Sequence, residues 1–336
     1  MKKNNTLLLS AMVIFFCSCH QQKQYLSYNG QTQGTSFHIL YETTKGKEYT
    51  RKIDSILTVV EKHFSLWDTS SILSQINRNA YRQVLPPLFV ELFTLARKVY
   101  DDSKGAFDPT IAPLIDLWGF GPEHKINPDT SQINDMLALV GMNKIKIKNN
   151  ILYKDHPDIT LNFNAIAQGY TVDLIADFFE KEGIENYLVE IGGEVRVKGV
   201  NPRGKYWRIG IDKPDETNIL PGNSLQSIVQ LHNLSVSTSG NYRNYYYDKG
   251  VRYAHTIDPE TGRPVTHNLL SATVFSPRCV LADAYATAMM VMGKEKAVKL
   301  AHALHLDVYL IYTDSTGTGV YMTDHVRRML TEELRP

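Results

Sequence analysis

Two short segments in the C-terminal third of the chain carry the residues best suited to chemistry. The first, from His255 to Pro264, reads His-Thr-Ile-Asp-Pro-Glu-Thr-Gly-Arg-Pro, so it combines an imidazole, the carboxylate of Asp258 and a hydroxyl. Its Pro and Gly content predicts a rigid turn rather than a regular element. The second segment places Asp283 and Thr287 four residues apart in a helical pattern, hence on one face. Hard oxygen ligands beside a histidine indicate a cation, a phosphate and a proton-transfer group.

Asp283 lies in an apolar stretch, which gives it two possible roles. Cys279, Val280 and Leu281 are close before it, and Ala, Tyr, Ala and Met follow. An unpaired carboxylate in such surroundings is costly. A divalent cation such as Mg²⁺ would remove that cost, and a structural helix cap or dipole partner would also explain the residue. The residues alone leave both interpretations open.

The elements that must position these segments are read from hydrophobic periodicity. Apolar residues at helical spacing predict helices at 47–64, 88–100, 131–140, 164–182, 281–292 and 294–304. Alternating or short apolar runs predict strands at 37–41, 145–147, 151–153, 159–163, 187–191, 195–200, 207–211, 226–231, 252–256, 308–312 and 319–322. Strands interrupted by helices without a regular βαβ alternation favour an α+β fold, with a largely antiparallel sheet core and flanking helices.

Three further patterns each allow a plain structural explanation. Gly192-Gly193 is followed by a strand and no third glycine, so it is not a Rossmann unit; it is a tight turn that serves the fold or lets a ligand approach. The run 237–242, Ser-Thr-Ser-Gly-Asn-Tyr, is read as a hydroxyl-rich turn that could offer N–H groups to a phosphate. His302 and His305 have no accompanying zinc motif, so zinc is rejected.

The N-terminus has the pattern of an export signal. Lys2 and Lys3 precede an apolar run at 7–16, and a small-residue site ends at Cys19, so residues 1–18 are predicted to be a lipoprotein signal peptide with Cys19 as the lipid acceptor. An ordinary secretory signal or a retained anchor is the alternative. The expected product is an exported lipoprotein, held on the membrane by its lipid anchor, on the periplasmic side.

The remaining chain, residues 19–336, is expected to form a single catalytic domain or two closely packed lobes. If Cys19 is lipidated, Cys279 is the only other cysteine beyond the signal, so no intramolecular disulfide can form. The full chain has 36 basic and 35 acidic residues. This balance gives no electrostatic footprint for nucleic acid, so DNA or RNA is not expected as a partner.

Eight short motifs follow one another in a fixed order. They are Ser-x-Trp at 65–67, Gly-Ala-Phe-Asp-Pro-Thr at 105–110, Trp-Gly-Phe-Gly at 118–121, Asn-Ala-Ile-Ala-Gln-Gly-Tyr-x-x-Asp at 164–173, Ile-Gly-Gly-Glu at 191–194, Thr-Ser-Gly-x-Tyr at 238–242, His-x-Ile-Asp-Pro-x-Thr-Gly at 255–262 and Ala-Asp-x-x-x-Thr at 282–287. Together they resemble the ApbE family of Mg²⁺-dependent FAD:protein FMN transferases, from Gly34 to Thr287.

The resemblance implies a reaction and the residues that carry it. Family members bind FAD with Mg²⁺, release AMP and pass FMN to a Thr or Ser hydroxyl of an acceptor protein. The acceptor is typically a subunit of a membrane redox complex that bears an Asp-x-[Ser/Thr]-Gly-Ala-Thr-like motif. By resemblance, His255 is the catalytic base and an FAD contact, and Asp283, Thr287 and the carbonyl of Ala165 are the metal ligands. Asp258 is then expected to hold the turn or the histidine.

The resemblance also implies FAD contacts, some at positions that depart from the family pattern. The implied contacts, besides His255, are Gln33, Trp67, Ala106, Phe107, Asp108, Asn162 and Gln168. Gln33 stands where Met is usual, so an apolar contact is lost or replaced. Asn162 and Gln168 stand where Asp and Lys or another charged residue are common. Both amides can still hydrogen-bond, so we expect altered affinity rather than lost chemistry.

Two alternatives to protein flavinylation remain open from the sequence. A metal-dependent FAD pyrophosphatase would use the same residues with water in place of the acceptor hydroxyl. A lipid-anchored flavin-binding protein without turnover would have no need of a base at His255. The sequence names neither the acceptor protein nor the oligomeric state.

Overall fold

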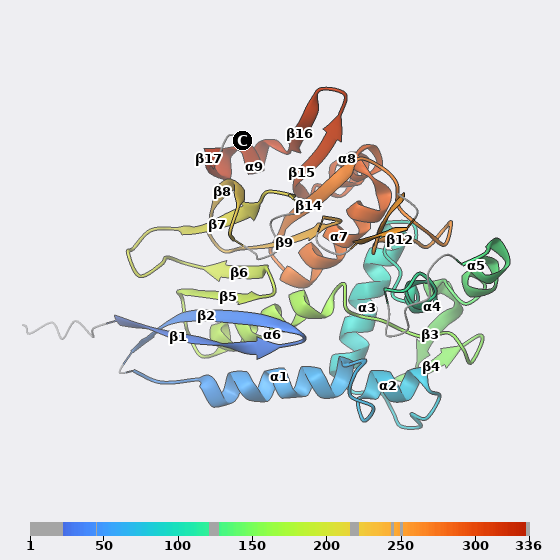
Figure 1. The fold of residues 1–336 in the computed structure, drawn as a ribbon. Helices are drawn as coiled ribbons and strands as arrows, with labels where there is room; N and C mark the ends of the chain where they lie inside the picture. Colours follow the sequence, from blue (N-terminus) through green and yellow to red (C-terminus); the bar gives the residue numbers. More distant parts are fainter. Residues whose placement is uncertain are drawn as a thin grey trace, which may run out of the picture.

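The centre of the fold is an antiparallel sheet. The computed structural model describes residues 23–44, 46–120, 128–215, 222–242, 245–248 and 251–333. In these residues, eight strands pair in the order β1-β2-β5-β6-β9-β14-β15-β16, from the β1–β2 hairpin at one end to the β15–β16 hairpin at the other (Figure 1). Their bounds are β1 Lys23–Thr32, β2 Thr35–Thr44, β5 Tyr187–Ile191, β6 Glu194–Lys198, β9 Leu234–Gly240, β14 Leu269–Ser276, β15 Asp307–Asp314 and β16 Gly317–Met322.

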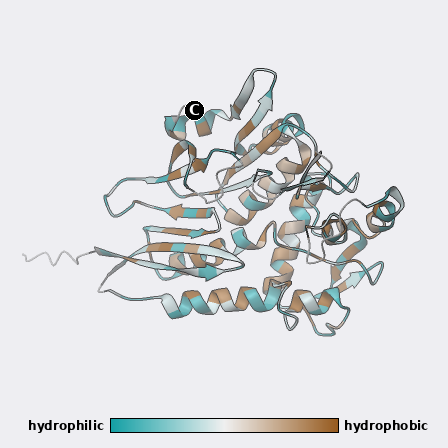
Figure 2. Cartoon of the chain, viewed as in Figure 1, coloured by the Kyte–Doolittle hydropathy of each residue, from teal (hydrophilic) through white to brown (hydrophobic). Residues whose placement is uncertain are grey.

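Helices cover one face of this sheet. α6 packs against β5 and β6, and α7 packs against β9, β14 and α6. α1 lies outside α6 and presents Ile53, Leu57 and Val60 to it, so hydrophilic and hydrophobic residues alternate along its length (Figure 2). The helices are α1 Thr50–Phe64, α2 Ile72–Asn77, α3 Pro87–Asp102, α4 Ala112–Leu117, α5 Thr130–Leu137, α6 Ala167–Lys181, α7 Cys279–Met292 and α8 Lys294–Leu304.

The other face of the sheet is covered by a smaller antiparallel sheet. Its strands, in the order β17-β8-β7, pack with α9 so that Trp207, Val229 and Val326 bury the outward side of Val236 and Phe275. These elements are β7 Trp207–Asp212, β8 Leu225–Leu231, α9 Asp324–Met329 and β17 Leu330–Glu333. Because β14 is covered on both sides, its residues are almost all buried.

Short hairpins complete the described structure. They are β3 Ile145–Lys148 with β4 Ile151–Lys154, β10 Tyr245–Asp248 with β11 Val251–Ala254, and β12 Ile257–Asp258 with β13 Arg263–Pro264; a short 3₁₀ helix spans Met142–Lys144. The predicted α+β class with a largely antiparallel sheet and flanking helices is confirmed. Among the residues described, no helix is long and apolar enough to cross a membrane.

The structure corrects two predicted elements. Residues 159–163 form no strand: the backbone of Leu161 pairs with a side chain, donating to Asn77 Oδ1 and accepting from Asn77 Nδ2, each at 2.8 Å. The run 237–242 is not a turn, because its first four residues belong to β9 and pair with β14, with Ser271 opposite Gly240. The Ser, Thr and Gly content of this run favours a turn, whereas pairing with β14 continues the strand through Gly240.

Several element boundaries also differ from the prediction. The helix expected at 164–182 begins at Ala167, after a turn over 164–166. The first strand, β1, begins at Lys23, well before the first predicted strand at 37–41. Residues 1–18 and Cys19 lie outside the described residues, so the signal peptide, the lipid anchor and the domain assignment for 19–336 stay predictions.

Candidate active site

A cavity of about 660 Å³ gathers the predicted site residues. They come from the loop after α1, the segment before α4, the extended segment before α6, α6 itself, the loop after β11, and α7. The predicted residues that line the cavity are Trp67, Ala106, Phe107, Asp108, Asn162, Ala165, Gln168, His255, Asp283 and Thr287. Elements distant in sequence therefore build one site.

Gln33 is the predicted contact that does not line the cavity. It occupies the turn between β1 and β2 with a φ of 50°, and its Nε2 donates to Thr171 Oγ1 on α6 at 2.7 Å. This bond ties the β1–β2 turn to the buried face of α6. In this structure Gln33 therefore supports the helix that carries Gln168.

The close packing of α6 against α7 places Asp283. Gly169 N donates to Asp283 Oδ2 at 3.0 Å. A Cβ added at Gly169 would lie only 2.6 Å from the carbonyl oxygen of Cys279 and 2.8 Å from the Asp283 Cβ, so only glycine allows this approach. One turn beyond Asp283 on α7, Thr287 Oγ1 lies 3.2 Å from Ser239 Oγ of β9, and this contact holds the Thr287 hydroxyl at the cavity wall.

Asp283 and Glu194 form a buried acidic pair. Their exposed fractions are 5% and 7%. Glu194 Oε1 accepts from Ser237 Oγ at 3.3 Å, while its Oε2 has no hydrogen-bond partner among the described residues. Burial raises the pKa of the Asp283 carboxyl to about 7, and burial together with the nearby Asp283 charge holds the pKa of Glu194 well above its usual range.

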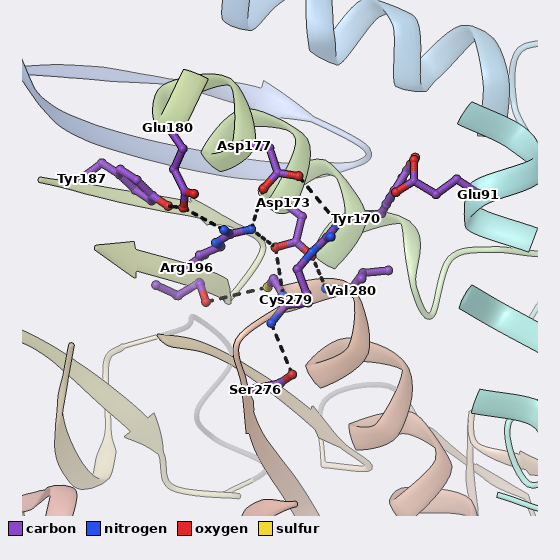
Figure 3. Close-up of polar contacts among 12 residues, drawn as sticks. Glu91, Tyr170, Asp173, Asp177, Glu180, Tyr187, Arg196, Ser276, Cys279 and Val280 are labelled. Carbon is purple, nitrogen blue, oxygen red and sulfur yellow. Dashed lines mark hydrogen bonds and ion pairs between the residues drawn. The ribbon is translucent and has the colours of Figure 1, made fainter. Parts of the chain in front are cut away.

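Asp173 is an internal comparison for this pair. It is fully buried, yet Arg196 lies 2.7 Å from its Oδ1 (Figure 3). Arg278 lies 3.0 Å from its Oδ2. Within the described residues, no basic side chain forms an ion pair with Asp283 or Glu194. The fold thus balances one buried carboxylate and leaves the other two without a counter-ion.

This missing counter-ion fits a bound cation. Asp283, Thr287 and Ala165 all line this cavity. A carboxylate, a hydroxyl and a main-chain carbonyl are a hard donor set of the type that Mg²⁺ prefers. Among the described residues no three or more His, Cys, Asp or Glu side chains gather in one metal cluster. The predicted ligand set contains only one such side chain, so it does not depend on a cluster of that kind.

His255 follows β11 and is held by a rigid turn. Asp258 Oδ1 accepts from Glu260 N at 2.9 Å, Oδ2 accepts from Thr261 Oγ1 at 3.1 Å, and its carbonyl accepts from Gly262 N at 2.8 Å. The turn is anchored to the core by Trp118, whose Nε1 donates to the Gly262 carbonyl at 2.7 Å. Asp258 therefore holds the turn, as expected.

Aromatic residues occupy both the wall and the rim of the cavity. Phe120 lines the wall and lies edge-on to His255, with ring centroids 6.3 Å apart. Trp118 is instead buried in the core, so of the two aromatic residues in this segment Trp118 packs in the core and Phe120 lines the site. Trp67 lies at the rim with 76% of its surface exposed. A large apolar ring exposed in this way suits stacking on a flat ring of a ligand.

Comparisons with known proteins agree with this geometry. Residues 33–310 match the ApbE family. The chain belongs to the ApbE family. It is 35% identical to the FAD:protein FMN transferase of Vibrio cholerae, covering 98% of this chain and 99% of the relative, and 33% identical to that of Escherichia coli, covering 97% of each. The relatives' shared name confirms the prediction of an enzyme of the FAD:protein FMN transferase class.

Solved structures of ApbE proteins have the same fold. The flavin transferase ApbE from Vibrio cholerae superposes with a TM-score of 0.82 at 34% identity, over 92% of this chain and all of that one. The Pseudomonas stutzeri flavinyl transferase ApbE, in its apo form, also gives 0.82, at 31% identity over 93% and 99%. The expected ApbE-like architecture is thereby confirmed.

Within this ApbE fold, the structure adds residues that the sequence did not single out. Glu194 lines the cavity, although the sequence motif that contains it did not predict a role in the site. A carboxylate directly after a Gly-Gly turn, at the start of a strand, is the sequence feature that indicates such a role. Thr238 and Ser239, which belong to the run predicted as a phosphate-binding turn, line the cavity instead as residues of strand β9. The Asp108 carboxylate accepts from Thr110 and Met142, so it holds its loop while its surface lines the cavity.

Proposed function

We propose that this protein transfers FMN from FAD to a Thr or Ser hydroxyl of an acceptor protein, in a Mg²⁺-dependent reaction that releases AMP. The observation that carries the proposal is the buried pair Asp283 and Glu194, which has no basic partner among the described residues and lies in the same cavity that His255 lines. A site built for a cation, beside a titratable imidazole, suits displacement at a diphosphate.

One set of residues binds the metal and the diphosphate, and His255 acts on the acceptor hydroxyl. Mg²⁺, when bound, would be held by Asp283, Thr287 and the Ala165 carbonyl, and it would offset the charge of the diphosphate. His255 takes the proton of the acceptor hydroxyl, a role suited to an imidazole near neutral pH. The freed oxygen bonds to the phosphorus of the FMN half as the bond from that phosphorus to the AMP oxygen breaks. The bridging oxygen leaves with AMP.

The remaining lining residues bind and orient FAD. Trp67 supplies a flat apolar face at the rim, and Phe107 closes the wall behind it. Asn162 and Gln168 present amides to the cavity, and each amide can both donate and accept a hydrogen bond. Binding along the whole dinucleotide holds the diphosphate near His255, which raises the effective concentration of the reacting groups.

The partner and location follow from the sequence. We infer an acceptor subunit of a membrane redox complex, with an Asp-x-[Ser/Thr]-Gly-Ala-Thr-like segment, and no nucleic-acid partner. The N-terminal pattern supports an exported lipoprotein anchored through Cys19 on the periplasmic side of a membrane. A lipid anchor would keep the enzyme near a membrane-bound acceptor.

One experiment separates transfer from its alternatives. The form lacking residues 1–18 is incubated with FAD, Mg²⁺ and an acceptor domain, and covalent flavin is detected by fluorescence on a denaturing gel while AMP and FMN are quantified. Labelled acceptor with one AMP per flavin supports the proposal. Free FMN with AMP and no label indicates a pyrophosphatase, and intact bound FAD indicates a storage protein; either result refutes flavin transfer.

The role of His255 is tested by a matched pair of histidine variants. His255→Ala should lower the transfer rate by about 10²- to 10⁴-fold while FAD binding persists, because a general base contributes that much. His302→Ala is the control, since the exposed side chain of His302 on α8 lies outside the cavity and its Nε2 is 3.1 Å from Tyr321 Oη. Normal transfer by His255→Ala would remove the base from the proposed mechanism.

A further inference from the structure

The two helices that meet at the site lack N-terminal caps of their own. The residues at the N-cap positions of α6 and α7 are Ile166 and Arg278, and neither side chain forms a capping hydrogen bond in the described structure. Ser, Thr, Asp and Asn normally fill this position, because the first N–H groups of a helix have no partner within it. The buried start of each helix must therefore find acceptors elsewhere.

Each helix supplies the acceptor for the other. Asp173 of α6 accepts from Cys279 N at its Oδ1 and from Val280 N at its Oδ2, both at 3.0 Å (Figure 3). In return, Asp283 of α7 accepts from Gly169 N in the first turn of α6 at 3.0 Å. Two carboxylates thus cap two helix starts in a reciprocal arrangement. Each also stabilises the positive end of the partner helix dipole.

The Asp173 end of this arrangement is fixed by charge. Arg196 of β6 contacts Asp173 and also Asp177 at 3.0 Å and Glu180 at 2.9 Å, so it joins three carboxylates of α6 to the sheet (Figure 3). Arg278 contacts Asp173 from the residue before α7. With both oxygens engaged by N–H groups and arginines, Asp173 has a single position.

The Asp283 end is only partly engaged. Its Oδ2 receives the Gly169 N–H, and the carboxylate lines the cavity one helical turn beyond Cys279. Since Asp173 holds the N–H of Cys279 and of Val280, it fixes the first turn of α7 and hence the direction in which Asp283 and the following Thr287 face.

We propose that Asp173 is a positioning residue for the cation and diphosphate side of the site, acting through the first turn of α7. This inference rests on the proposed function, because it assigns Asp283 to a Mg²⁺ site. When Asn replaces Asp173, one of the two oxygens becomes an NH₂ group that cannot accept a hydrogen bond. The first turn of α7 then loses one of its two acceptors and the pairing with both arginines, and Asp283 loses its fixed place relative to Ala165 and Thr287. Partners behind metal ligands commonly change metal affinity by about 10- to 100-fold.

The test measures cation binding directly, with Mn²⁺ as a spectroscopic substitute for Mg²⁺. Binding to the protein without FAD is followed by electron paramagnetic resonance, and folding by thermal unfolding. Asp173→Asn should weaken Mn²⁺ binding by about 10- to 100-fold. Glu180→Gln is the matched control: it neutralises another carboxylate on Arg196 but touches no N–H of α7, so its Mn²⁺ affinity should stay within about twofold.

A rescue variant shows whether the effect passes through the helix start. Arg278 has φ −114° and ψ 126°, the extended conformation of an N-cap residue, so Ser at this position can cap α7 locally. The double variant Asp173→Asn/Arg278→Ser also removes one charge of each sign. It should regain Mn²⁺ binding to within about threefold of the unmodified protein, as expected if a local cap replaces most of the lost hydrogen bonding.

The outcomes separate this inference from the function on which it rests. If the unmodified protein binds no Mn²⁺, or if Asp283→Ala binds it normally, the proposed metal site is wrong. If Mn²⁺ binds through Asp283 but equally well to Asp173→Asn, or if Glu180→Gln loses as much affinity, the positioning role is refuted. Should Asp173→Asn fail to fold, a folded double variant with restored binding supports the role, and an unfolded double variant overturns it.

Discussion

Replacing Asp283 by Asn should make the metal-free protein more stable while it removes cation binding. Asn keeps a carbonyl oxygen for the Gly169 N–H and nearly the same volume, so the main change is the loss of a buried charge. Burial raises the pKa of Asp283 to about 7, whereas an aspartate in an unfolded chain titrates near 3.9. The folded protein therefore disfavours the ionised form.

The size and pH dependence follow from this difference. A gap of about three pKa units corresponds to on the order of 4 kcal/mol at most, since each unit is worth about 1.4 kcal/mol. Because the folded pKa is the higher one, the penalty is absent below about pH 4, grows as pH rises, and is complete above about pH 7. For a chain of 336 residues, about 4 kcal/mol corresponds to roughly 6 °C in melting temperature.

The assay is thermal unfolding in a chelator between pH 5 and pH 8, repeated with excess Mg²⁺. At pH 8 without metal, Asp283→Asn should melt several degrees above the unmodified protein, and the difference should shrink as pH falls. Mg²⁺ should raise the melting temperature of the unmodified protein only, by mass action. Asp173→Asn is the control of opposite sign, because it leaves two arginines and two N–H groups without their carboxylate. A destabilised Asp283→Asn at pH 8 would refute the reasoning.

Three other substitutions test the packing and the rim of the site. Trp67→Ala should leave the melting temperature nearly unchanged, because this side chain is 76% exposed, and weaken FAD binding by the roughly 0.5–1.5 kcal/mol of a lost stacking contact, as measured by flavin titration. Gly169→Ala should destabilise the protein by about 1–3 kcal/mol, since its Cβ would meet the Cys279 carbonyl at 2.6 Å; unchanged urea unfolding would contradict the close helix approach. Asn77→Ala should cost about 1–3 kcal/mol in the same assay, because the Leu161 N–H and carbonyl lose their partner; a neutral result would show that water replaces it.

Local sequence pattern predicted those parts of the fold whose stability is decided locally. The helix at 294–304 was predicted with the bounds observed for α8, because its apolar spacing and the Gly before it are unambiguous. The segment at 159–163 has the same alternation as a strand, yet its partner is the side chain of Asn77 rather than another strand. No pattern within those five residues could reveal that partner.

The opposite error at 237–240 has the same physical origin. Ser, Thr and Gly favour turns when they are solvated, but here β14 pairs with all four residues, and β6 pairs with residues 234–236 just before them. Tertiary hydrogen bonding outweighs the weak local preference. Two of these hydroxyl residues, Thr238 and Ser239, line the cavity.

The distinction between Asp173 and Asp283 shows where sequence reasoning on the site reaches its limit. Both lie within helices among apolar neighbours, both are buried, and both accept N–H groups from the other helix. Their local sequences therefore allow either a structural or a catalytic role. They differ in their neighbours: Arg196 and Arg278 contact Asp173, whereas Glu194 lies near Asp283. A second carboxylate beside a buried aspartate, in place of a basic side chain, lowers the stability of the folded protein. The cost is explicable if a bound cation removes it, so the lack of a basic partner for Asp283 among the described residues, more than the carboxylate itself, supports its proposed role as a metal ligand.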